Sequence, residues 1–67
     1  MINKPKLLSA LALINKSKAE YAAFLGISRS ALSRKINGKS CFTLDEIQKS
    51  GQDSCFGKEI CRDIFLL

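Results

Sequence analysis

Apolar residues recur along the chain at intervals of three and four positions, which places them on one face of a helix. No stretch alternates between apolar and polar residues as a half-buried strand does. The stripes predict short helices over residues 5–14, 18–25, 28–37, 44–50 and 57–65. Their core-facing residues are Leu7, Leu8, Leu11 and Ile14; Tyr21, Ala22 and Leu25; Ala31, Leu32 and Ile36; and Ile60, Cys61, Ile64 and Phe65.

Capping residues mark the ends of these helices. Gly26 suits the end of the second helix because glycine adopts a positive φ without steric cost. Ser28 is a favourable N-cap for the third helix, and Thr43 with Glu46 has the spacing of a capping box that opens the fourth. We therefore expect an all-α fold, a compact bundle of four to five short helices in one domain that spans residues 1–67.

Basic residues are concentrated in the first part of the chain. Residues 1–39 contain eight lysines and arginines and one acidic residue, a net charge of +7, whereas residues 40–67 carry a net charge of −2. A basic face suits a polyanion, of which nucleic acid is the usual one. A merely solubilising surface is the alternative interpretation.

Composition argues against catalysis and against metal binding. The chain has no histidine, which excludes Ser-His and Cys-His nucleophile pairs and Cys/His zinc fingers. A chain of 67 residues is also small for a cofactor site and a substrate pocket, so we expect no enzyme, no cofactor and no small-molecule ligand. Cys41, Cys55 and Cys61 form no C-x-x-C pair and are odd in number, which favours reduced thiols without metal, with Cys61 buried and Cys41 exposed.

The start of the chain has some features of a secretion signal. Lys4 and Lys6 precede an apolar run over residues 7–14, but that run is short and no small-residue cleavage site follows it. A membrane span requires about 20 apolar residues. We therefore expect a cytoplasmic protein with no membrane partner.

Residues 18–38, with the sequence KAEYAAFLGISRSALSRKING, carry the clearest functional signal. Ala22 is small where two helices would cross, Gly26 makes the turn, and Leu32 fills the space between the helices. This is a helix-turn-helix pattern. It resembles the helix-turn-helix of lambda-repressor-like and Cro-like regulators of phages and bacteria, including the Asn37-Gly38-Lys39 sequence that closes the recognition helix.

The resemblance extends to residues 37–40, 42–47 and 60–65, which look like the corresponding segments of short phage-encoded members. Ser50-Gly51 and Cys55 depart from the pattern, since relatives tend to carry apolar residues there. These departures leave the packing of residues 50–57 open.

One side of the third helix has a composition suited to reading DNA. Five polar residues without an acid among them fall within about 140° of the helix circumference. Arginine pairs with guanine and asparagine with adenine through two hydrogen bonds, and serine reaches bases or phosphates. The predicted base-contacting residues are Arg29, Ser30, Ser33, Arg34 and Asn37, and the predicted phosphate-contacting residues are Lys18, Ser28 and Lys39.

Aromatic residues fit packing better than stacking on single-stranded bases. Tyr21, Phe42, Phe56 and Phe65 lie at predicted core positions, whereas Phe24 is expected on the outer side of its helix.

The resemblance implies a small sequence-specific transcriptional regulator, a phage or prophage Cro-like switch protein in a bacterial host cell. It would bind double-stranded operator DNA in the major groove with the helix 28–37, as a homodimer on a two-fold operator. The alternative is an antirepressor or modulator that binds a phage repressor protein, because a fold does not fix a function.

Overall fold

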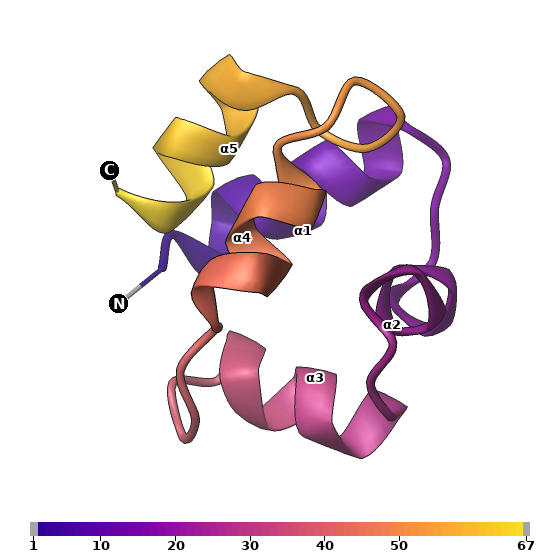
Figure 1. Ribbon diagram of the computed structural model, residues 1–67, viewed down its shortest axis with the longest axis vertical. Coiled ribbons are helices and arrows are strands. Elements are labelled where there is room, and N and C mark those ends of the chain that lie inside the picture. Colours follow the sequence, from indigo (N-terminus) through magenta and orange to yellow (C-terminus); the bar gives the residue numbers. More distant parts are fainter. Residues whose placement is uncertain (1, 67) are drawn as a thin grey trace.

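The computed structural model describes residues 2–66, which fold into five helices without a strand (Figure 1). The all-α prediction is therefore confirmed, and the predicted boundaries hold to within one or two residues. The helices are α1 (Lys4–Leu13), α2 (Lys18–Leu25), α3 (Arg29–Ile36), α4 (Leu44–Ser50) and α5 (Lys58–Phe65).

The helix ends follow the capping chemistry predicted for them. Ser28 accepts a hydrogen bond from the backbone N–H of Ala31 at 3.1 Å and so caps α3. Gly26 ends α2 with φ +78°, a left-handed conformation that a side chain would strain. Thr43 and Glu46 form the predicted capping box at the start of α4.

The core lies between the inner faces of all five helices. The predicted stripe residues are mostly buried, although Leu8, Ile14, Ala31 and Ile60 remain partly accessible. The fully or largely buried apolar residues are Leu7, Ala10, Leu11, Tyr21, Ala22, Leu25, Leu32, Ile36, Cys55, Phe56, Cys61, Ile64 and Phe65.

The segment between α4 and α5 is packed into this core. Cys55 and Phe56 are both buried, and the ring of Phe56 lies 5.3 Å from that of Tyr21, centroid to centroid. Cys61 is buried and Cys41 is exposed, as predicted, and all three thiols are free. Burial raises the pKa of the Cys55 and Cys61 thiols, which keeps them protonated at neutral pH.

The expected position of Phe24 was wrong. Its ring is partly buried and packs against the core instead of facing solvent freely. The ammonium group of Lys16 lies 5.2 Å from the ring centroid, within the range of a cation–π contact. None of the helices in the described part of the chain has the length and apolar character needed to cross a bilayer.

Candidate nucleic-acid interface

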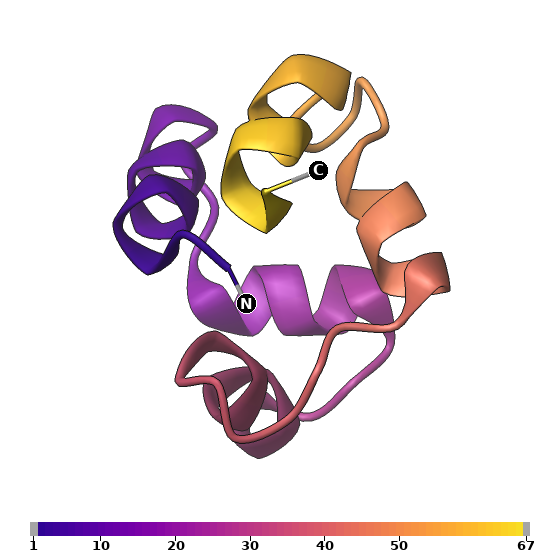
Figure 2. The ribbon, with the colours of Figure 1, turned by 90° about the vertical axis from the view of Figure 1, so that its left-hand side faces the viewer.

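The α2–α3 pair forms one edge of the molecule. Figure 1 shows α2 end-on and Figure 2 shows α3 end-on, so the two helices cross at a steep angle. Ala22 and Leu32 are each 1% exposed, consistent with a close crossing filled by one small and one large side chain. The N–H of Ile27 donates to the Ala22 carbonyl at 3.0 Å and closes the turn that Gly26 permits.

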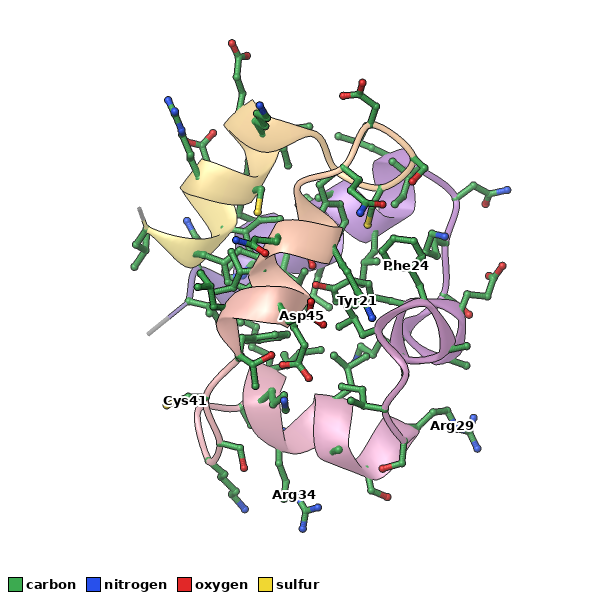
Figure 3. All side chains as sticks on the ribbon, in the orientation of Figure 1. Tyr21, Phe24, Arg29, Arg34, Cys41 and Asp45 are labelled. Atoms are coloured by element: carbon green, nitrogen blue, oxygen red, sulfur yellow. The ribbon has the colours of Figure 1, made fainter. Side chains whose placement is uncertain are left out.

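The outer side of α3 is exposed along its whole length. Leu32 and Ile36 point into the core, and Figure 3 shows Arg29 and Arg34 pointing away from the other helices. The structure thus brings all five predicted base-contacting residues to one exposed face, here called the reading face. It consists of Arg29, Ser30, Ser33, Arg34 and Asn37.

The predicted phosphate-contacting residues lie at the ends and at the turn of the helix-turn-helix. Lys18 is exposed in the first turn of α2, and Lys39 is exposed just beyond α3. The N–H of Lys39 donates to the Arg34 carbonyl at 2.8 Å, which fixes the backbone at this end of the helix. Ser28 is exposed as well, but its Oγ already accepts the capping hydrogen bond, which leaves its hydroxyl proton for another acceptor.

A lysine that the sequence did not indicate lies beside the reading face. Lys4 at the start of α1 donates from Nζ to Oδ1 of Asn37 at 2.8 Å. These residues are 33 positions apart, and no local pattern relates them. Only the packing of α1 against the rest of the fold brings them together.

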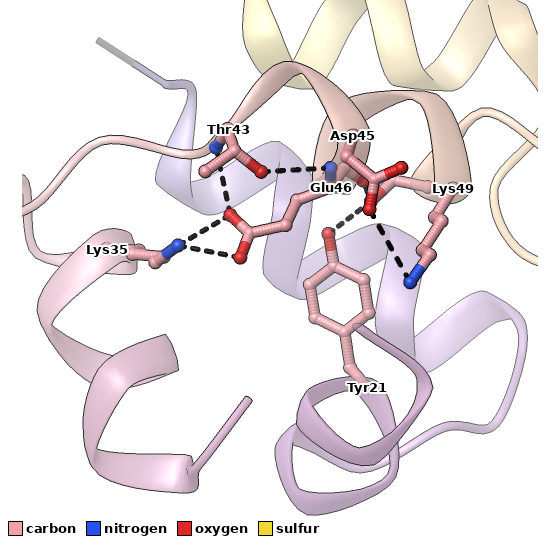
Figure 4. Close-up of polar contacts among 7 residues, drawn as sticks. Tyr21, Lys35, Thr43, Asp45, Glu46 and Lys49 are labelled. Atoms are coloured by element: carbon pink, nitrogen blue, oxygen red, sulfur yellow. Dashed lines mark hydrogen bonds and ion pairs between the residues drawn. The ribbon is translucent and has the colours of Figure 1, made fainter. Parts of the chain in front are cut away.

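The third basic residue of α3, Lys35, lies on the inner side of the helix in a different environment. Lys35 donates from Nζ to both carboxylate oxygens of Glu46, at 2.5 and 2.7 Å, and the two side chains are only 13% and 8% exposed (Figure 4). Burial alone would raise the pKa of Glu46, but the hydrogen bonds and charge of Lys35, together with the N–H of Thr43, lower it. Glu46 is therefore ionised at neutral pH and joins α3 to the start of α4.

A neutral hydrogen-bonded chain lies next to this ion pair. Ser50 is fully buried and donates from Oγ to the Glu46 carbonyl at 2.8 Å. Tyr21 lies 2.6 Å from the same Oγ, and since the serine proton is already used, the phenol is the donor. Burial, offset only in part by this bond, raises the pKa of Tyr21 well above its usual range. The Ser50 hydroxyl thus forms hydrogen bonds with both the Glu46 carbonyl and the Tyr21 hydroxyl.

Comparison with known proteins agrees with this architecture. A helix-turn-helix family model matches residues 7–49, which is more than half of the chain. This match shows a DNA-binding transcription regulator of the helix-turn-helix class. The chain belongs to the helix-turn-helix family of the lambda-repressor and Cro type. No match was found among curated proteins or among solved structures.

Proposed function

We propose that this regulator recognises a specific operator by inserting α3 into the major groove of double-stranded DNA. The observation that carries the proposal is the reading face, which is exposed and polar and contains no acidic side chain. The major groove is about 12 Å wide and admits an α-helix. The eight residues of α3 span about 12 Å along the axis, which is enough to reach a few successive base pairs.

Each residue of the interface has a role in this proposal. Arg29 and Arg34 bind guanine through O6 and N7. Asn37 binds adenine or the polar edge of a neighbouring base. The two serines of the reading face, Ser30 and Ser33, contact bases or phosphates. Lys18, Ser28 and Lys39 bind phosphates on either side of the groove and set the register of the helix.

The biological role that fits best is that of a phage or prophage Cro-like switch protein acting in the bacterial cytoplasm. One short helix reads too few base pairs for selectivity in a genome, so two copies on a two-fold operator are required. The domain formed by residues 1–67 needs no cofactor for this function. It would repress by occupying the operator.

A second candidate is an antirepressor that binds a phage repressor protein. The observation that favours it is a shallow, mostly apolar groove of about 400 Å³ between α4 and α5, on which Leu44 is 71% exposed. Leu66 beyond α5 is 60% exposed as well. A protein partner could cover these side chains without involving α3.

One experiment separates the two candidates. The protein is mixed with a random double-stranded DNA pool, and the enriched duplex is compared with a scrambled duplex by fluorescence anisotropy at several salt concentrations. We expect binding to the enriched duplex about 10³-fold tighter or more, with an affinity that falls as salt rises. No enrichment and no affinity at low salt would contradict operator recognition. Tight binding to a repressor encoded beside the gene would then support the antirepressor.

A further inference from the structure

The N-terminus of α1 is tied to α5 and lies next to the C-terminal end of α3. Asn3 caps α1 by accepting the N–H of Lys6 at 3.2 Å, and its own N–H donates to the Ile64 carbonyl of α5 at 2.7 Å. These two bonds fix the backbone on the N-terminal side of Lys4. The hydrogen bond from Lys4 to Asn37 therefore starts from an ordered helix end that is tied to α5.

Lys4 has no competing acidic partner in the part of the chain that the structure describes. The neighbouring Lys6 pairs with Asp63 at 3.9 Å, but no ion pair of residues 2–66 includes Lys4. Its positive charge also lies at the C-terminal end of α3, where the helix dipole favours a cation. The absence of an acidic partner among residues 2–66 and the dipole of α3 both favour the observed position of the Lys4 ammonium group.

This bond determines how the amide of Asn37 is oriented. A lysine ammonium only donates hydrogen bonds, so the atom facing Lys4 is the amide oxygen. That oxygen keeps one free lone pair, and Nδ2 keeps both of its N–H donors. An adenine edge requires one acceptor and one donor from the amide, and both remain available.

We propose that Lys4 is a positioning residue for Asn37 and thereby influences which base the C-terminal end of the reading face selects. The inference rests on the proposed operator recognition. In this proposal, Lys4 holds the amide of Asn37 in one orientation before DNA arrives. Asn37 therefore loses less side-chain freedom when DNA binds. A simple phosphate contact by Lys4 is the rival explanation, and it would carry no direct sequence information.

A double-mutant cycle distinguishes these explanations. Lys4→Ala, Asn37→Ala and the double variant are measured against the enriched duplex and its single-base variants. We expect both single variants to lose preference at the same base pair, and the double variant to be no less selective than Asn37→Ala. Lys6→Ala is the matched control, because it removes the same charge from the same helix. Preference kept in Lys4→Ala, with affinity lowered equally for every duplex, would overturn the proposal.

A second measurement does not depend on DNA. In the free ¹⁵N-labelled protein, the two side-chain amide proton signals of Asn37 should shift in Lys4→Ala and stay in place in Lys6→Ala. Unchanged Asn37 signals in Lys4→Ala would refute the positioning role even if the wild type binds DNA selectively. If the wild type selects no DNA, operator recognition itself fails, and the positioning role fails with it even if the contact is present.

Discussion

The two sides of α3 use basic residues in opposite ways. Arg34 is exposed and has no ion pair among residues 2–66, whereas the adjacent Lys35 is held by both carboxylate oxygens of Glu46. The charge of Arg34 is available to a ligand, and that of Lys35 is neutralised within the fold. The number of basic residues in a helix-turn-helix sequence therefore overstates the positive charge that is available to DNA.

Hydrogen-bonding capacity differs between the two sides in the same way. Within the described residues, no buried side-chain nitrogen or oxygen lacks a hydrogen-bond partner. On the inner side, Glu46 of α4 bonds to Lys35 of α3 (Figure 4). Ser50, also on α4, bonds to Tyr21 of α2 and to the Glu46 carbonyl. The reading face keeps its capacity for a ligand, apart from the bond between Asn37 and Lys4. Substitutions on the inner side should therefore change stability, and those on the outer side should change binding.

The largest effect is expected from Glu46→Gln, which removes the buried charge but keeps an oxygen that can accept the Thr43 N–H. Lys35 is then left almost buried without a counter-charge, which should lower the free energy of unfolding by about 3 kcal/mol. Urea denaturation measures this loss. Asp45→Asn is the matched control, because it changes charge by the same amount in an exposed pair with Lys49 and should cost less than about 0.5 kcal/mol. Equal losses in the two variants would contradict the distinction between inner and outer sides.

The same ion pair predicts an acid-dependent loss of stability. The pKa of Glu46 is below its ordinary value of 4.5 in the folded protein, so the unfolded chain takes up a proton first as pH falls. The stabilisation is complete above pH 4.5 and is lost as pH falls through the lower pKa of the folded state. The free energy of unfolding, measured against pH, should fall more steeply below pH 4.5 in the wild type than in Glu46→Gln. Parallel curves would exclude this contribution.

A smaller loss of stability is expected when the neutral chain is broken. Ser50→Ala leaves the buried phenol of Tyr21 without its acceptor, which should cost about 2 kcal/mol. Tyr21→Phe should cost about 1 kcal/mol, because Ser50 still donates to the Glu46 carbonyl. The double variant should be less destabilised than the sum of the two, as measured by thermal and urea unfolding. Ser54→Ala, in an exposed turn, should stay within about 0.5 kcal/mol of the wild type.

The sequence predicted those parts of the fold and site that local chemistry determines. The caps at Gly26, Ser28 and Thr43, and the division of α3 into a polar and an apolar side, follow from residues within one or two turns of each other. The helical wheel even places Lys35 at about 240° from Arg29, away from the reading face. Its pairing with Glu46 was not predicted, because it depends on the path of the chain over residues 37–43.

Contacts between distant segments were missed for the same reason. The bond between Tyr21 and Ser50 and the bond between Lys4 and Asn37 join residues 29 and 33 positions apart. In the sequence, Ser50 was only a polar residue at a position where an apolar one was expected. Its role becomes clear only when Tyr21 is found opposite it, which requires the packed arrangement of α2 against α4.

On the outer side, Arg34→Ala should weaken binding without changing stability. Loss of a two-bond contact to guanine should reduce discrimination between the enriched and the scrambled duplex by about 1–3 kcal/mol. The free energy of unfolding should change by less than about 0.5 kcal/mol, because Arg34 is exposed. Ser30→Ala tests the same face in the same way. If both variants discriminate between the duplexes as the wild type does, α3 is not the helix that reads DNA.

The smallest effect is expected at the lysines at the two ends of the helix-turn-helix. Lys18→Ala and Lys39→Ala should weaken binding to the enriched and scrambled duplexes by the same factor, because phosphates carry no direct sequence information. Each variant should also make the slope of log K against log salt shallower by about one unit, since one fewer counterion is released. Lys58→Ala removes an equal charge from an exposed position on α5, away from the α2–α3 edge, and should leave the slope unchanged. A slope altered equally by all three substitutions would mean that DNA responds to the total charge of the protein. DNA would then not be bound specifically by the edge that α2 and α3 form.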